Sequence, residues 1–140
     1  MSGHIQISLK AGERIYINGA VVRADRKVTL QFLNDVVFIL ENHVMQADET
    51  TTPLRQLYFV VQALLMDPRN AAATRTLFNQ MHACTMASFT NEAIRAELAA
   101  IAQMVDDDSA FDALKRLRAL FPREDAILDG PAADRESRAA

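Results

Sequence analysis

The chain has 140 residues, the usual size of a single domain, and half of them are hydrophobic, which is enough to build a core. Its formal net charge of −3 argues against a protein that coats nucleic acid, because such proteins are usually strongly basic. The charge is unevenly distributed: residues 1–47 hold five basic and four acidic side chains, and residues 48–140 hold ten basic and fourteen acidic ones. A mildly basic front therefore precedes an acidic remainder.

The single cysteine, Cys84, has no partner for an intramolecular disulfide, and a lone thiol is typical of a reducing compartment. The N-terminal stretch MSGHIQISLK lacks the long apolar segment of a secretory signal. The longest apolar stretches fall far short of the roughly 20 residues that span a bilayer. We therefore expect a cytoplasmic protein with no membrane partner.

The first third of the chain has the patterns of β-strands. Ile5, Ile7 and Leu9 alternate with polar residues, which is the period of a strand with one buried face. Asn18-Gly19 predicts a two-residue type I′ hairpin turn. A fully apolar run, VVFIL, favours a strand that is central or covered on both faces. The predicted strands are 5–9, 13–17, 20–23, 28–32 and 36–40.

Helical spacing replaces this alternation after residue 43. Thr52 can cap a helix whose first turn holds Pro53, where the missing N–H costs nothing. Asp67-Pro68 ends this helix and starts a second one. A third helix is expected at about 90–105 and a fourth at 109–122, with Pro122 as its end. The predicted buried positions are Leu54, Leu57, Tyr58, Val61, Leu64 and Leu65, then Leu77, Phe78, Met81 and Cys84 or Thr85, then Ile94, Leu98, Ile101 and Val105, and finally Phe111, Leu114, Leu117, Leu120 and Phe121.

These elements predict an α+β fold, with a small N-terminal antiparallel β-sheet followed by a C-terminal bundle of about four helices. Residues 1–47 form the β region and residues 48–122 the helical region, and we expect the two to make one compact unit. Residues 123–140 have no apolar period and are expected to form a flexible tail.

The sequence has no pattern typical of a catalytic or metal site. His4, His43 and His82 are scattered, and His82 and Cys84 are two positions apart on a helix, so they point in different directions. There is no glycine-rich phosphate loop and no nucleophile elbow. The run at 106–108 lacks the glycine and terminal glutamate of a calcium loop, and its acids fit a helix junction. We expect a protein that is not an enzyme and carries no cofactor or metal.

The basic positions of the first third have a possible binding role. Arg14 and Tyr16 lie two apart on a strand and are expected to share its solvent face. A cation beside an aromatic ring suits single-stranded RNA, whose splayed bases stack on both. Edge strands also carry Lys and Arg to prevent aggregation, so the pattern alone leaves both interpretations open. The candidate RNA-binding residues are Lys10, Arg14, Tyr16, Arg23, Arg26 and Lys27.

Four ordered segments together resemble the FlbT family of flagellar biosynthesis regulators. The most specific pieces are the Leu-Lys-x-Gly-Glu-Arg entry, the Ile-Asn-Gly-Ala turn and the Thr-Pro…Tyr-Phe…Asp-Pro frame of the first helix. The resemblance covers the chain from about Ile5 to Glu124, and leaves the stretch 69–90 and the tail without a role. The segments are LKAGERIYINGAVVR (9–23), VVFILENHVM (36–45), TPLRQLYFVVQALLMDP (52–68) and ALKRLRALFPRE (113–124).

The resemblance implies a cytoplasmic bacterial protein that acts after transcription. Such a regulator associates with the 5′ untranslated leader of flagellin mRNA and lowers its translation or lifetime, although some family members activate. It also implies a partner regulator, FlaF, and flagellin itself as possible partners, and it supplies no catalytic residues.

Two hypotheses remain open at the level of the sequence. In the first, the chain is a non-enzymatic regulator that presents its basic front to the flagellin message. In the second, it is a protein-interaction adaptor or chaperone-like module of flagellar assembly that acts on RNA only indirectly, as its acidic, methionine-bearing helical half allows. Pairing of an exposed sheet edge with a second copy could make a dimer in either case.

Overall fold

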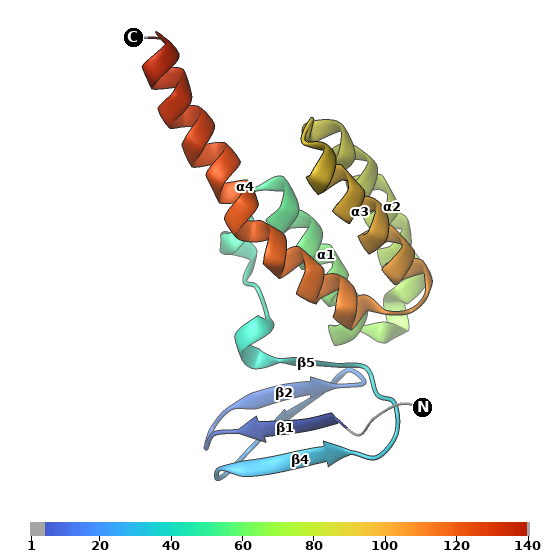
Figure 1. Cartoon of the computed structure of the whole chain (residues 1–140). Helices are drawn as coiled ribbons and strands as arrows, with labels where there is room; N and C mark the ends of the chain where they lie inside the picture. The colour runs from blue at the N-terminus through green and yellow to red at the C-terminus, as the bar shows by residue number, and fades with distance from the viewer. Residues whose placement is uncertain (1–4, 140) are drawn as a thin grey trace.

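The computed structural model describes residues 5–139, and side chains for residues 5–128 of these; His4 lies outside the described residues. Strands occupy the first third and helices the rest, which confirms the predicted α+β fold (Figure 1). The elements are β1 (Ile5–Leu9), β2 (Arg14–Ile17), β3 (Ala20–Arg23), β4 (Val28–Phe32), β5 (Phe38–Leu40), α1 (Pro53–Met66), α2 (Ala71–Ser88), α3 (Glu92–Asp106) and α4 (Ala110–Ala139), with the short 3-10 helices η1 (Glu41–His43), η2 (Ala47–Glu49) and η3 (Pro68–Asn70).

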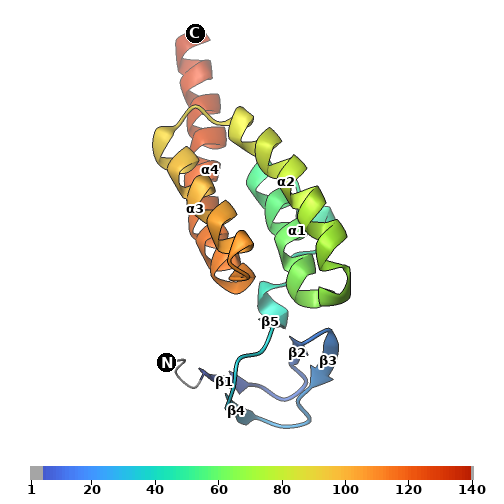
Figure 2. The same cartoon turned by 90° about the vertical axis from the view of Figure 1, so that its right-hand side faces the viewer.

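The strands form two antiparallel sheets instead of the single sheet expected from the sequence. One sheet pairs β1 with β4, and the other has the order β3-β2-β5. The β2–β3 hairpin turns at Asn18 and Gly19, whose φ angles are 51° and 87°, so the predicted type I′ turn is confirmed. The helices lie as a separate layer on one side of the sheets (Figure 2).

Strands β2 and β5 are covered on both faces, because the β1–β4 sheet lies on one side and the helices lie on the other. Ile15 and Phe38 are buried in a small core between the two sheets. Ile39, the neighbour of Phe38, points the other way and joins the helical core. The prediction that the apolar run 36–40 forms a doubly covered strand is therefore confirmed. Tyr16 packs against the same helical core from β2.

The helical core is organised around α1, which contacts α4, α2 and β5. Thr52 caps α1 by accepting the N–H of Arg55 at 3.2 Å, as its sequence predicts. The predicted buried stripe of α3 is confirmed in full. On α2 the prediction was partly wrong: Phe78 and Thr85 are buried, whereas Leu77 is exposed because α2 packs on the bundle with a narrower face.

Helix α4 does not end at Pro122, as the sequence led us to expect, but continues to Ala139. Beyond the proline, Glu124 is fully buried and Ile127 packs against the helical core, so tertiary contacts hold the helix together where propensity opposes it. Figure 1 shows α4 changing direction part way along, and a proline is an established cause of such a bend. The flexibility of residues 123–140 stays a prediction. Across the described range, no helix has the length and apolarity required to cross a bilayer.

Candidate nucleic-acid interface

Five of the six candidate residues gather at one end of the two sheets. In Figure 1 the arrow of β1 points to the edge at which β2 and β4 begin. Strand β3 ends at the same edge, because it runs antiparallel to β2. Arg14 and Arg23 lie opposite each other across the β2–β3 pair. Leu9 pairs with Val28, so Lys10, which follows Leu9, lies at the same end as Lys27, which precedes Val28. We call this group the cationic tip; its members are Lys10, Arg14, Arg23, Arg26 and Lys27.

Backbone hydrogen bonds hold the two loops of the cationic tip together. The Gly12 N–H donates to the Ala24 carbonyl at 2.7 Å, and the Ala24 N–H donates to the Glu13 carbonyl at 2.9 Å. Gly12 has a φ of 84°, which favours glycine at this turn. The Glu13 carboxylate folds back and accepts the N–H of Lys10 at 2.7 Å. The loops therefore present their cations from a defined backbone.

Three carboxylates lie among these cations, those of Glu13, Asp25 and Glu41. Only two of the five cations form an ion pair with one of them. Glu41 accepts the Arg14 backbone N–H at 3.0 Å and its Nε–H at 3.1 Å. These bonds, the backbone one foremost, hold the pKa of Glu41 below its ordinary value. The Arg26–Asp25 pair, at 3.5 Å and more than 80% exposed on both sides, contributes little. No carboxylate among the described side chains forms an ion pair within 4.0 Å with the other three cations, Lys10, Arg23 and Lys27, although the charge of Arg23 also helps to lower the pKa of Glu41.

Tyr16 does not belong to this surface, which corrects the expectation that it faces solvent beside Arg14. Its ring is partly buried against the helical core, while the Arg14 side chain, two positions away at the start of β2, is 51% exposed. The expectation assumed one sheet with an open face, but the helices cover this face of β2. The geometry leaves a cluster of exposed cations without the predicted stacking ring beside it.

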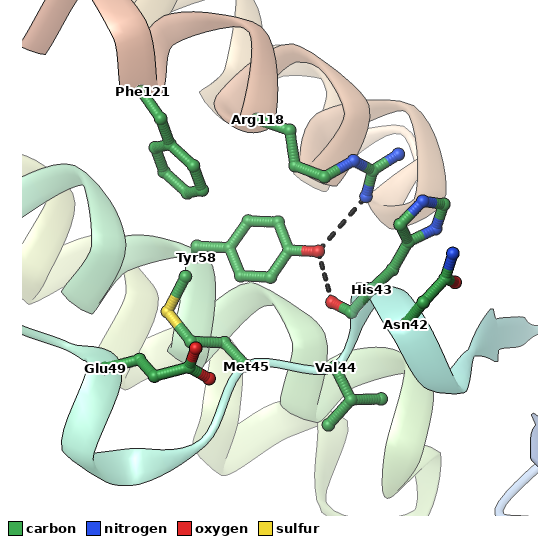
Figure 3. A pocket seen from close by; sticks show the side chains of 8 residues that line it. All are labelled: Asn42, His43, Val44, Met45, Glu49, Tyr58, Arg118 and Phe121. Carbon is green, nitrogen blue, oxygen red and sulfur yellow. Dashed lines mark hydrogen bonds between the residues drawn. The ribbon is translucent and has the colours of Figure 1, made fainter.

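A second polar feature, a pocket, lies between η1 and the helices and was not predicted from the sequence (Figure 3). It encloses about 210 Å³. Tyr58 donates its hydroxyl proton to the His43 carbonyl at 2.5 Å and accepts a hydrogen bond from Arg118 Nη1 at 3.1 Å. We call it the Arg118 pocket; it is lined by Asn42, His43, Val44, Met45, Glu49, Tyr58, Arg118 and Phe121.

Burial sets the protonation states in the Arg118 pocket. It lowers the pKa of His43, and the charge of Arg118 lowers it further, so the imidazole is neutral at pH 7. Burial also raises the pKa of Tyr58, which keeps its hydroxyl protonated. Within residues 5–128, the buried Nδ1 of His43 has no hydrogen-bond partner. Among the described residues that line the pocket, Arg118 is the only cation.

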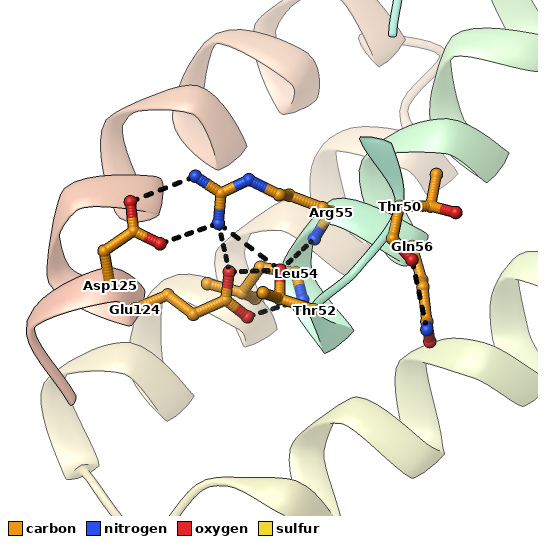
Figure 4. A network of polar contacts seen from close by, with 7 residues as sticks. All are labelled: Thr50, Thr52, Leu54, Arg55, Gln56, Glu124 and Asp125. Carbon is orange, nitrogen blue, oxygen red and sulfur yellow. Dashed lines mark hydrogen bonds and ion pairs between the residues drawn. The ribbon is translucent and has the colours of Figure 1, made fainter. Parts of the chain in front are cut away.

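Two polar clamps fix the pocket walls. The buried amide of Gln62 accepts the Met45 N–H and donates to the Met45 carbonyl, both at 2.8 Å, which holds the segment after η1 against α1. Arg55 lies 4.5 Å above the centre of the Phe121 ring and pairs with Glu124 at 3.1 Å (Figure 4). Sequence reasoning missed these residues because a lone Gln or Glu on a helix carries no signal of a distant partner.

Nothing in the described side chains points to a metal site, since no group of three or more His, Cys, Asp or Glu residues is placed to hold an ion. The arrangement offers hydrogen-bond donors and cations for an anionic ligand.

Comparison with known proteins matches residues 5–128 to the model of the family described as "Flagellar protein FlbT". Three similar curated proteins are a "Probable flagellum biosynthesis repressor protein FlbT" of Allorhizobium ampelinum, 51% identical over 92% of this chain and 87% of that protein, one of the same name from Rhizobium johnstonii at 53% with the same coverage, and "Probable flagellum biosynthesis repressor protein FlbT 2" of Bradyrhizobium diazoefficiens at 51% over 93% and 96%. No solved structure matches the chain. At this identity and coverage, the chain belongs to the FlbT family.

Proposed function

We propose that this chain regulates flagellin synthesis in the cytoplasm after transcription, by associating with the 5′ untranslated leader of flagellin mRNA and lowering its translation or stability. The names of the relatives, which describe repressors of flagellum biosynthesis, support a regulatory role and its negative sign. The observation that carries RNA contact is the cationic tip, where three cations form no ion pair with a carboxylate among the described residues. Cations of this kind neutralise phosphates.

The tip also explains how a protein of net charge −3 can bind a polyanion. The excess of acidic residues lies in residues 48–140, and Figure 1 shows the strand ends that carry the tip at one edge of the sheet layer. An RNA strand that meets the sheet end first therefore approaches a locally positive surface. In this proposal Tyr16 has no part, since its ring packs on the helical core.

Binding of the purified chain to a labelled flagellin leader, measured by fluorescence anisotropy over a range of salt, tests this function. Each phosphate contact on a single strand contributes about −0.7 to the slope of log affinity against log salt. We expect Arg23→Gln with Lys27→Gln to flatten the slope by about 0.7 per lost contact. The control pair Arg69→Gln with Lys115→Gln removes the same charge from two exposed positions outside the tip. Equal slopes for both pairs would move RNA contact away from the tip.

The adaptor function is the second candidate, and a groove at the far end of the bundle favours it. This groove holds about 330 Å³, and its walls include Phe89, Ile127 and the 45% exposed Leu128. An apolar groove of this kind suits a segment of flagellin or of the FlaF regulator. An electrophoretic mobility shift assay with the flagellin leader separates the two functions. A shift with the purified chain alone supports direct RNA binding, and a shift that appears only after FlaF or flagellin is added supports the adaptor.

The chain could also act as a dimer, since β3 is an edge strand of its sheet and exposes Val21 and Val22. Pairing of β3 with the β3 of a second copy would cover both side chains and bring two cationic tips into one assembly. Light scattering of the purified chain decides between monomer and dimer.

A further inference from the structure

We propose that the Arg118 pocket binds one phosphate group of the RNA strand that lies on the cationic tip. The inference rests on the proposed function, because it names a second contact for the same ligand. It adds a site on the helical half, which sequence reasoning had left to protein partners.

The first argument is the bonding of Arg118, which differs from that of the other partly buried arginines. Arg55 pairs with two carboxylates, Arg75 pairs with Asp108, and Arg95 donates to the backbone carbonyls of residues 86 and 89. Arg118 makes one hydrogen bond, to the neutral Tyr58 hydroxyl, and no described carboxylate pairs with it. A guanidinium carries five N–H donors. Most of those on Arg118 thus remain available for an anion.

The second argument is the polarity of the surrounding walls. Asn42 is exposed at the pocket and can donate from its amide. His43 is neutral, so Arg118 supplies the positive charge of the pocket without help from the imidazole. The one carboxylate of the pocket, Glu49, lies across the Tyr58 ring from Arg118 in Figure 3 and already accepts the Gln46 N–H at 2.7 Å. An anion entering beside Arg118 therefore meets donors first.

The third argument is size and position. A volume of about 210 Å³ is below the ~300–1,000 Å³ of typical small-molecule pockets, which favours a single group that protrudes from a longer ligand. The pocket is also linked to the tip through η1, because Glu41, the partner of Arg14, directly precedes Asn42 and His43 in that helix. An RNA strand bound at Arg14 has to pass η1 to reach Arg118.

The decisive experiment adds a negative charge at the pocket without disturbing a hydrogen bond. Asn42→Asp places a carboxylate at an exposed position that lines the pocket, and Asn79→Asp places the same charge at an exposed position of α2 that does not. In the anisotropy assay with the flagellin leader, we expect Asn42→Asp to weaken binding about tenfold and Asn79→Asp less than about twofold. Equal effects of the two variants would overturn the inference.

A second pair of variants tests Arg118 itself. Arg118→Gln should reduce the salt slope by about 0.7 and Arg123→Gln, at an exposed position of the same helix, should leave it unchanged. Thermal unfolding shows whether Arg118→Gln still folds; should it not, Asn42→Asp alone decides. If the unmodified chain fails to bind the leader, the proposed function fails; if it binds and the pocket variants bind as well as their controls, only the pocket assignment fails.

The phosphate could also come from a free anion, and inorganic phosphate is the probe for that source. Amide NMR of the whole chain during a phosphate titration reports on Asn42 and Arg118. Shifts that saturate at micromolar phosphate would overturn the assignment to RNA, whereas shifts that stay small up to about 10 mM would support it, because a single phosphate without its strand binds weakly.

Discussion

The carboxylate of Glu124 accepts the backbone N–H of Leu54, which precedes it by 70 positions, at 2.9 Å (Figure 4). Both residues are fully buried. The same carboxylate accepts the hydroxyl of Thr52 at 2.5 Å and a hydrogen bond from Arg55 at 3.1 Å. A side chain of α4 thus satisfies a free N–H of the first turn of α1, where a negative charge is favoured by the helix dipole.

We expect Glu124→Ala to destabilise the chain by about 3 kcal/mol, because it leaves the Leu54 N–H and the Thr52 hydroxyl buried without an acceptor. The free energy of unfolding in urea measures this loss. Asp125→Asn is the matched control, since the Asp125 side chain pairs with the same Arg55 but is 47% exposed, and it should cost less than about 1 kcal/mol. A loss below that of the control would show that Glu124 is not the clamp between α1 and α4.

Truncation gives an independent prediction for the same contact. A chain that ends after Pro122 loses Glu124 and Ile127, whereas one that ends after Leu128 keeps both. We expect the shorter chain to unfold at a temperature lower by several degrees, as a loss of a few kcal/mol implies for a protein of this size, and the longer one to unfold close to the full chain. Circular dichroism during heating measures both. Equal unfolding midpoints for the two truncated chains would show that residues 123–128 belong to a dispensable tail, as their composition suggests.

The hairpin and the helices could be predicted because their signals are local. Asn18-Gly19 requires only its own two φ angles, and the buried stripe of α3 requires only its own period. Tyr16 and Glu124 could not be predicted, because their places depend on partners far along the chain. Period-2 alternation tells which side chains share a face of β2, but not that the helices cover that face.

The candidate site shows the same difference between features with local signals and features that depend on distant partners. The five cations of the tip lie close to loops that the sequence predicted, and the Asn18-Gly19 hairpin places Arg14 opposite Arg23. The pairing of β1 with β4, which brings Lys10 and Lys27 to the same end, was not predicted. The Arg118 pocket joins η1 to α1 and α4, and its geometry depends on the Tyr58 hydroxyl reaching the His43 carbonyl. No pattern of residue spacing in the sequence predicts that hydrogen bond.

A second buried side chain, Gln62, supports the pocket and gives the next prediction. Its amide pairs with both backbone groups of Met45, so Gln62→Leu leaves a donor and an acceptor without partners. We expect a loss of about 2–3 kcal/mol in the free energy of unfolding in urea. Gln56→Leu, on the exposed face of the same helix, removes a single 3.4 Å bond to Thr50 and should cost less than about 0.5 kcal/mol. Similar losses for the two glutamines would contradict a structural role for the Met45 pairing.

His43 makes the stability of the chain depend on pH in the acid range. Because burial lowers its pKa from the ordinary 6.5, the unfolded chain binds a proton at a higher pH than the folded chain does. Its contribution to stability is therefore complete above about pH 6.5 and is lost as the pH falls toward the folded pKa.

We expect His43→Gln to reduce the drop in melting temperature between about pH 7.5 and about pH 5.5, while the backbone carbonyl that accepts the Tyr58 hydroxyl stays in place. Asn42→Gln, at the neighbouring exposed position, carries no titrating group and should retain the full drop. Differential scanning calorimetry at the two pH values measures both variants. Should the His43 variant lose as much stability on acidification as the unmodified chain, the acid sensitivity belongs to other groups and the imidazole is not held neutral by its burial.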